Sequence, residues 1–117
     1  MIRDEFFTNE DAGSISLRMS GHAGAAEAGK DIICAAASIL AYTVAQAMQF
    51  MHEQGGLLEK PRIQLSDGDA IIAAKPMPEI YAEALHTFFV AQIGFHLLSH
   101  NYPQYVELKS FGTSNGS

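Results

Sequence analysis

The chain has one cysteine, no tryptophan and few basic residues among its 117 positions. The single cysteine, Cys34, excludes an intramolecular disulfide, and no basic and apolar leader opens the sequence. We therefore expect a cytoplasmic protein in a reducing compartment. The length fits one domain, which we expect to span residues 1–109 and to be followed by a flexible polar tail over 110–117.

Positive charge is scarce as well as scattered. The chain has 7 Lys and Arg against 13 Asp and Glu, which gives a formal net charge of −6. Binding to phosphates depends on clustered Lys and Arg, so nucleic acid is not expected as a direct partner. A basic protein partner suits this charge better.

One long stretch of the chain is uncharged. No Asp, Glu, Lys or Arg stands between Asp31 and Glu53. Such a stretch reaches the length of a membrane span, about 20 apolar residues. We disfavour a span because serine, threonine, tyrosine and glutamine interrupt the stretch and the flanking segments read as strands. The sequence predicts a helix from Ile32 to about His52, buried on most sides.

In the remaining segments, polar and apolar residues alternate as in strands, or apolar residues recur at the period of a second helix. Strict alternation from Ser14 to Ser20 places Ile15, Leu17 and Met19 on the core side. The predicted strands are 2–7, 14–20, 62–66, 69–75 and 105–109, with a tight turn at Asp67-Gly68. The fold class is therefore α+β, with an antiparallel or mixed sheet of about five strands and two main helices in the order ββαββαβ.

The second helix is predicted from about Pro78 to Ser99. Large and small apolar residues recur there at a helical period, namely Ile80, Ala84, Leu85, Phe88, Phe89, Ile93 and Leu97. This pattern predicts a packing face. Phe88, Phe89 and Phe95 are accordingly interpreted as core or dimer contacts.

Cys34 falls near the predicted start of the first helix. If Asp31 is the N-cap, Cys34 occupies the third helical position, beside backbone N–H groups that no helical carbonyl reaches. These groups and the helix dipole favour a thiolate, and cysteines so placed titrate at about 3.5 to 7.5. The same amides could hold the oxyanion that forms when a thiolate attacks a carbonyl.

A thiolate peptidase also needs an imidazole, and His22 is the best candidate. If the alternation of the strand 14–20 continued, His22 would lie on the same side as the polar strand residues. Its approach to Cys34 therefore depends on a turn at Gly21. Asp31 has two roles open to it, helix cap or orienter of the imidazole. Ser38 lies one helical turn after Cys34 and could hydrogen-bond the site.

Other interpretations compete with catalysis. A lone cysteine is often an inert, buried residue, and the chain could be a non-enzymatic acidic module that binds basic ribosomal protein tails. A redox sensor would lack a resolving cysteine. His96 and His100 have the spacing of two zinc ligands on a helix, but no third ligand is evident, so neither a metal nor another cofactor is expected.

Two segments carry a resemblance to a known family. Gly21-His22-Ala23-Gly24 and Gly29-Lys30-Asp31-Ile32-Ile33-Cys34-Ala35-Ala36-Ala37-Ser38 resemble the signature of the bacterial ribosomal-processing cysteine protease family, Prp. The resemblance implies that Cys34 is the nucleophile and His22 its dyad partner. Gly21, Ala23, Asp31 and Ser38 would then support the site or bind substrate, under a flap formed by the loop between the two motifs.

The resemblance also implies a substrate and an assembly. Members of the family remove a short N-terminal extension from large-subunit ribosomal protein number twenty-seven, cutting after an apolar stretch that contains aromatic residues. They are homodimers. The expected function is therefore that of a cysteine endopeptidase that supports ribosome assembly, although Ala25-Ala26 replace an aromatic residue that several relatives carry in the flap.

Overall fold

The computed structural model describes residues 1–21, 30–66 and 68–110. Its elements confirm the predicted order. They are β1 (Ile2–Asn9), β2 (Ser14–Ser20), α1 (Lys30–Glu53), β3 (Arg62–Ser66), β4 (Asp69–Ala74), a 3-10 turn η1 (Pro78–Ile80), α2 (Tyr81–Asn101) and β5 (Val106–Ser110). Ser110, assigned from the sequence to the tail, belongs to β5, and the rest of the predicted tail lies outside the described residues.

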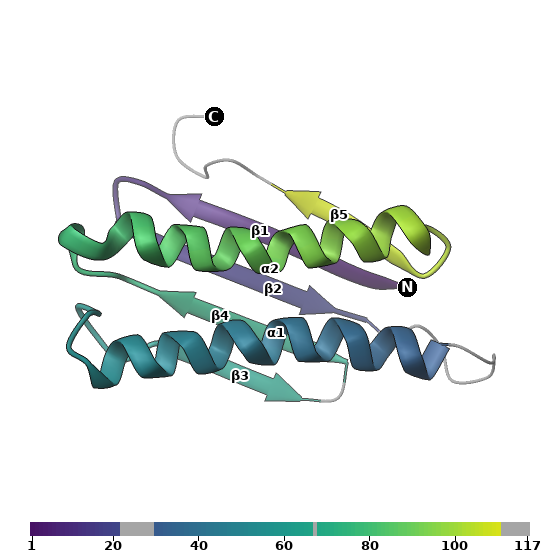
Figure 1. The fold of residues 1–117 in the computed structure, drawn as a ribbon, viewed down its shortest axis with the longest axis horizontal. Coiled ribbons are helices and arrows are strands. Elements are labelled where there is room, and N and C mark those ends of the chain that lie inside the picture. Colours follow the sequence, from purple (N-terminus) through teal and green to yellow (C-terminus); the bar gives the residue numbers. More distant parts are fainter. Residues whose placement is uncertain (22–29, 67, 111–117) are drawn as a thin grey trace.

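The five strands form one mixed sheet in the order β3-β4-β2-β1-β5. β1 and β5 are parallel, and the other three pairings are antiparallel. Both helices lie on the same face of this sheet, so the domain has two layers (Figure 1). Gly68 has a φ of 79°, as the predicted tight turn requires, while Asp67 lies outside the described residues.

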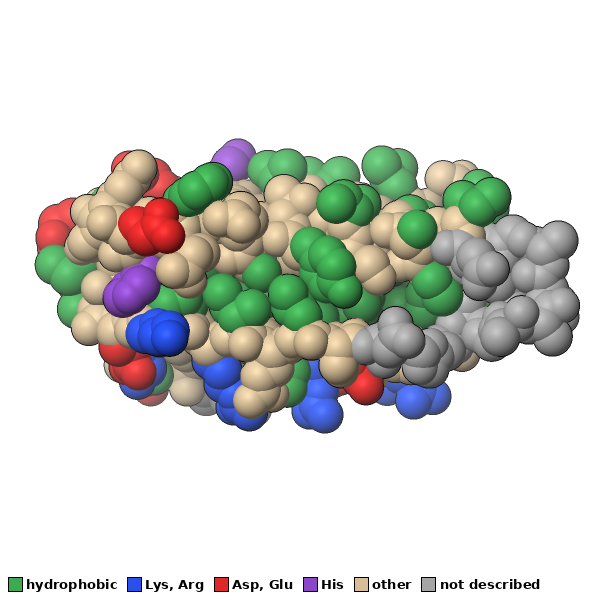
Figure 2. Space-filling model, turned by 90° about the horizontal axis from the view of Figure 1, so that it is seen from below, with side chains coloured by type: hydrophobic (Ala, Val, Ile, Leu, Met, Phe, Trp, Pro, Cys, Tyr) green, Lys and Arg blue, Asp and Glu red, His purple; other side chains and the backbone are tan. Residues whose placement is uncertain are grey.

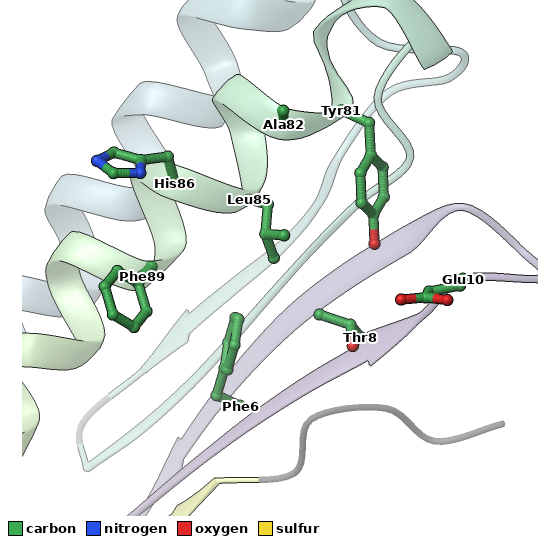
Figure 3. A pocket seen from close by; sticks show the side chains of 8 residues that line it. All are labelled: Phe6, Thr8, Glu10, Tyr81, Ala82, Leu85, His86 and Phe89. Atoms are coloured by element: carbon green, nitrogen blue, oxygen red, sulfur yellow. The ribbon is translucent and has the colours of Figure 1, made fainter. Parts of the chain in front are cut away.

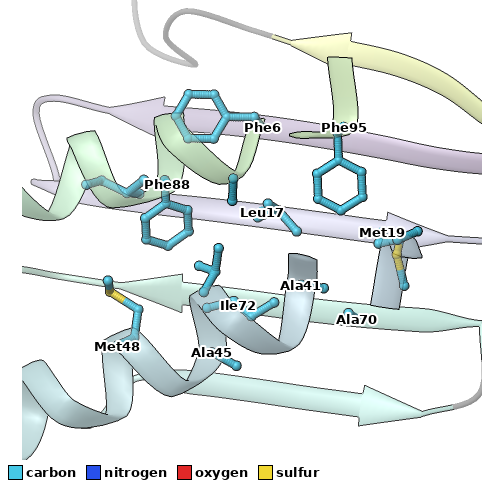
Figure 4. Packing of buried hydrophobic residues seen from close by; sticks show 14 of the residues in the cluster. Phe6, Leu17, Met19, Ala41, Ala45, Met48, Ala70, Ile72, Phe88 and Phe95 are labelled. Carbon is cyan, nitrogen blue, oxygen red and sulfur yellow. The ribbon is translucent and has the colours of Figure 1, made fainter. Parts of the chain in front are cut away.

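The core lies between the helices and the sheet (Figure 4). Ile15, Leu17 and Met19 are buried there, which confirms the parity that alternation predicted for β2. The opposite face of the sheet carries polar and charged side chains such as Arg3 and Arg18. One face of each strand therefore faces the helices and the other faces solvent.

The first helix differs from its prediction in its surroundings. Its buried side chains form one stripe, made of Ile33, Ala37, Ala41, Val44, Ala45 and Met48. Ile32 is 75% exposed, and Ile39, Tyr42 and Phe50 are exposed as well. The prediction of a helix buried on most sides is wrong, because a two-layer domain has nothing beyond its helix layer to cover the outer face.

Length and composition alone would let α1 cross a membrane. Its segment Ile32–Glu53 has a mean hydropathy of 1.5, and it is the one helix of this kind in the described part of the chain. The buried stripe of α1 packs on the sheet, as a core helix of a globular domain does.

The second helix buries only part of the predicted apolar set, and Phe88 and Phe95 are core residues, as interpreted. Its buried residues are Ala84, Phe88, Ala91, Gln92 and Phe95. Phe89, Ile93 and Leu97, which the sequence placed with them, are exposed. Apolar residues surround α2 on nearly every side, so the apolar period alone does not identify the face that meets the sheet.

Candidate active site

Gly21, which opens the first predicted motif, and Cys34 of the second lie toward the same end of the molecule. β2 ends at Ser20 at the end of the sheet where α1 begins (Figure 1). Gly21 follows β2 directly, and His22 itself lies outside the described residues, as does Ala23. The structure therefore brings Gly21, the first residue of the first motif, to the end of the sheet where the helix that carries Cys34 begins.

Gly21 redirects the chain where β2 ends. Its φ of 92° lies in the left-handed region, which side chains other than glycine rarely adopt. A Cβ at this position would stand 2.3 Å from the carbonyl oxygen of Met1. Both observations explain why this position requires glycine, and the positive φ agrees with the turn that the sequence analysis placed at Gly21.

Cys34 is half-buried and packs at the rim of the core. It is the fifth residue of α1, since the helix begins at Lys30. Side chains of a helix lean toward its N-terminus, so the Cys34 sulfur is inclined toward the first turn, whose N–H groups have no carbonyl partner within the helix. The thiol is thus on a partly exposed residue, one turn after the start of α1.

The start of α1 differs from the predicted one. Because α1 begins at Lys30, two residues before the predicted start at Ile32, Asp31 lies inside the first turn, and Cys34 is two positions further into the helix than predicted. Lysine is a good helix former, which allows the first turn to include Lys30. Ser38 is half-buried one turn after Cys34.

Cys34 faces the side of α1 that is turned away from α2. A Cβ on Gly94 of α2 would stand 2.6 Å from the Leu40 side chain, so Leu40 marks the flank of α1 that meets α2. Cys34 stands about 120° around the helix from Leu40, with the buried stripe between them. The thiol and Ser38 therefore lie on the flank toward β3.

A buried carboxyl group is a feature that the sequence analysis missed. Asp4 in β1 is fully buried and accepts a hydrogen bond from Gln92 Nε2 in α2. Burial raises the pKa of Asp4 to about 7, the Gln92 hydrogen bond lowers it, and the charge of Glu5 raises it further. The sequence contains an indication of this burial, because Asp4 alternates with Ile2 and Phe6 on the same face of β1.

A pocket of about 370 Å³ lies far from Cys34, where α2 begins beside the end of β1. Figure 3 shows Phe6, Leu85 and Phe89 around it and the hydroxyl of Tyr81 directed toward β1. Burial, and then the charge of Glu10, raises the pKa of Tyr81. This pocket has no part of either catalytic motif in its lining.

The histidines of the second helix are surface residues. The rings of His96 and His100 are stacked with centroids 6.4 Å apart, and both side chains are exposed. Within residues 1–21, 30–66 and 68–110 there is no group of three His, Cys, Asp or Glu side chains that could hold a metal ion.

An α+β domain that presents one accessible thiol close to a helix start has the arrangement of a thiol-dependent enzyme. The chain belongs to the cysteine protease Prp family, since the model of that family matches residues 1–107. This result confirms the resemblance that the two motifs indicated. Among curated proteins no sequence matches the chain.

Solved structures share the fold over almost the whole chain. The crystal structure of SMU.848 from Streptococcus mutans is 25% identical, with a TM-score of 0.70, and the match covers 97% of this chain and 96% of that one. The essential ribosomal processing protease Prp from Staphylococcus aureus, solved with a covalently linked product peptide, is 24% identical, with a TM-score of 0.69 and coverage of 95% and 100%. The same S. aureus protease with a substrate peptide is 22% identical, with a TM-score of 0.67 and coverage of 95% and 100%.

Proposed function

We propose that the chain is a cytoplasmic cysteine endopeptidase that removes the short N-terminal extension of large-subunit ribosomal protein number twenty-seven and so supports ribosome assembly. The observation that carries the proposal is that, in a domain of the Prp family, Gly21 at the end of β2 and Cys34 near the start of α1 lie toward the same end of the sheet. The peptide complexes of the S. aureus protease support a peptide substrate.

In this mechanism the Cys34 thiolate attacks the carbonyl carbon of the scissile bond. The oxyanion that forms is held by backbone N–H groups of the first turn of α1, toward which the sulfur is inclined. The C–N bond then breaks, and His22 gives its proton to the departing amine. The product of this half-reaction is a thioester between Cys34 and the upstream peptide.

Water completes the reaction. His22 removes a proton from the water that attacks the thioester carbonyl, the C–S bond breaks, and the thiolate is restored together with imidazolium. No metal or cofactor takes part in these steps. Asp31 lies in the first turn of α1, which leaves orientation of the imidazole as its proposed role.

The test is cleavage of a peptide that spans the ribosomal protein's extension. Cys34→Ala and His22→Ala should each reduce kcat by at least about a thousandfold, since residues of a nucleophile–base pair act as a unit. His86→Ala, which removes an exposed imidazole on α2, should leave cleavage unchanged. Normal turnover by Cys34→Ala would contradict the proposal.

The rival function is the non-enzymatic acidic module, and the net charge of −6 is the observation that favours it. Both functions predict binding of a basic ribosomal protein. Only the enzyme converts the bound precursor into two fragments, so mass spectrometry of the incubated precursor separates them.

We further propose that the protein is a homodimer joined through the outer face of its helix layer. This face carries the exposed apolar side chains Ile39, Tyr42, Phe50, Phe89, Val90, Ile93 and Leu97. A groove of about 370 Å³ runs between the helices beside Leu40, Val44 and Val90. Exposed apolar patches of this kind mark protein contact sites.

Sedimentation analysis tests the dimer. Val90→Glu should shift the protein to a monomer, because it places a charge in the middle of the buried surface. Leu58→Glu is the matched control, since Leu58 is equally exposed but lies outside both helices. A monomeric unsubstituted protein at all concentrations would exclude this assembly.

A further inference from the structure

We call the space between β3 and the flank of α1 that carries Cys34 and Ser38 the seam. It has features that suit an extended peptide. β3 stands first in the sheet order, so within the described residues no strand pairs with its outer edge. An edge strand presents a row of N–H and C=O groups that can pair with a further strand. An extended peptide can therefore add to β3 as a sixth strand.

The side chains beside this edge are apolar. Ile63 pairs with Ile72, and Leu65 pairs with Ala70. Because Ile72 and Ala70 are buried under the helices, Ile63 and Leu65 have their side chains on the helix face of β3. Leu65 is nevertheless 42% exposed, because nothing in the described part of the chain covers its outer side.

The helix side of the seam is free of charge. No Asp, Glu, Lys or Arg stands between Asp31 and Glu53 in α1. Figure 2 shows apolar side chains gathered along this edge of the molecule, between the helix layer and the sheet. An uncharged lining of this kind fits apolar side chains of a peptide and excludes charged ones, which would lose their hydration without gaining a partner.

The seam leads to the proposed nucleophile. Cys34 lies on the flank of α1 that faces β3, away from the Leu40 flank. β3 also runs toward the end of the sheet where α1 begins (Figure 1). A peptide that lies along β3 in the same direction therefore presents its C-terminal end to Cys34, which means that the residues before the scissile bond occupy the seam.

We propose that the apolar residues upstream of the scissile bond add to the free edge of β3 as a parallel strand, with alternate side chains against Ile63 and Leu65. This inference rests on the proposed function and names the part of the protein that selects the substrate. Ile63 and Leu65 are specificity residues in this scheme, and they touch the substrate without taking part in the chemistry.

Binding to a Cys34→Ala chain tests the proposal without turnover. The probe is a fluorescein-labelled peptide that spans the extension and the first residues of the mature ribosomal protein, and the readout is fluorescence anisotropy. Leu65→Glu should raise Kd by about tenfold or more, because a charge replaces an apolar contact in the seam. Gln64→Glu makes the same change in charge on the opposite, exposed face of β3 and should alter Kd by less than about twofold.

A second measurement tests the strand pairing itself. N-methylation of single upstream residues of the peptide removes one N–H donor at a time. Residues of a β-ladder alternate in the edge they present, so affinity should fall at every second position. In the enzyme with Cys34 intact, Leu65→Glu should raise KM and leave kcat within about threefold.

The outcomes separate this proposal from the function on which it rests. Equal effects of Leu65→Glu and Gln64→Glu, or N-methyl effects without alternation, would overturn the β3 groove while cleavage by Cys34 stands. Cleavage that survives Cys34→Ala would overturn both. A change of oligomeric state in Leu65→Glu with unchanged peptide affinity would assign the seam to a second copy of the chain and overturn its role in substrate binding.

Discussion

The half of the domain under α2 is filled differently from the half under α1. In the first half, α2 packs Phe88 and Phe95 against β1 and its neighbours and carries the buried Asp4–Gln92 pair. In the second half, α1 covers β4 with aliphatic side chains, methionine and alanine and no buried aromatic ring, and it bears Cys34 near its start. The small buried residues of α1 are Ala37, Ala41 and Ala45.

This difference indicates a division of labour within one sheet. Large buried side chains contribute most to stability, because the free energy gained on burial is proportional to the apolar area removed from water. The two largest of them, Phe88 and Phe95, stand in the half under α2. Both halves end in an edge strand, β5 on one side and β3 on the other. The half that carries the proposed nucleophile has the exposed apolar side chain of Leu65 beside its edge, which stability alone would not favour but a peptide substrate would use.

The largest effect on stability is expected from a substitution of Phe88, which tests the difference between the two halves. Phe88→Ala should lower the free energy of unfolding by about 3 to 5 kcal/mol, because it empties the fully buried centre of the α2 half. Val44→Ala in α1 is the counterpart and should cost about 2 kcal/mol, since fewer buried atoms are lost. Urea unfolding measures both. An equal cost at the two positions would mean that the halves contribute alike.

The second prediction concerns the buried carboxyl group of the α2 half. The pKa of Asp4 is raised from 3.8 to about 7 in the folded protein. The folded state therefore holds a proton that the unfolded state has released between these two values, so stability is greatest below about pH 4 and falls as the pH rises through about 7. Since each pKa unit corresponds to about 1.4 kcal/mol, the loss amounts to as much as about 4 kcal/mol.

Asp4→Asn should remove this dependence. An amide cannot ionise, and its oxygen can still accept the hydrogen bond from Gln92. Unfolding by urea at a series of pH values should then give a flatter profile and a variant that is more stable than the unsubstituted chain at about pH 8. Glu5→Gln is the control, because Glu5 lies on the other face of β1 and should leave most of the slope in place. An unchanged slope in Asp4→Asn would show that Asp4 is ionised in the fold.

How far the sequence could predict these features depends on the kind of signal. Alternation in β2 gave the correct buried face, and the Asp67-Gly68 pair placed the β3–β4 turn, because both are local properties of the chain. The faces of α2 could not be predicted in the same way. Phe88 and Phe89 are adjacent and equally apolar, and only the position of the sheet decides that Phe88 is buried.

The candidate site was predictable in part for a similar reason. The two motifs and the turn at Gly21 were legible in the sequence, as was the parity that buries Asp4. The orientation of Cys34 toward β3 was not, because it depends on which flank of α1 meets α2, and Leu40 and Gly94 are 54 residues apart in the sequence. The start of α1 at Lys30 shows the usual uncertainty of a helix boundary.

The third prediction concerns Gly21, at the boundary between the halves, where the chain leaves β2. Gly21→Ala should cost about 2 to 3 kcal/mol, since a Cβ meets the Met1 carbonyl and the left-handed φ is strained as well. It should also lower kcat/KM for the peptide, because the next residue is His22. Gly13→Ala shares the positive φ but meets nothing within 4 Å, so it should cost only about 1 kcal/mol and leave cleavage unchanged. Full activity of Gly21→Ala would show that this turn does not position the imidazole.

The smallest effect is expected at the outer edge of the α2 half. Arg3 Nε lies 3.1 Å from Glu107 Oε1, and the two residues are paired across β1 and β5 on the solvent face of the sheet. Both side chains are well exposed, so Glu107→Gln should lower stability by less than about 1 kcal/mol, and the difference should vanish in about 1 M salt. Urea unfolding at low and high salt measures it. A larger loss that persists in salt would mean that the charged edge strand, and not the buried aromatic side chains alone, distinguishes this half of the sheet from the open edge at β3.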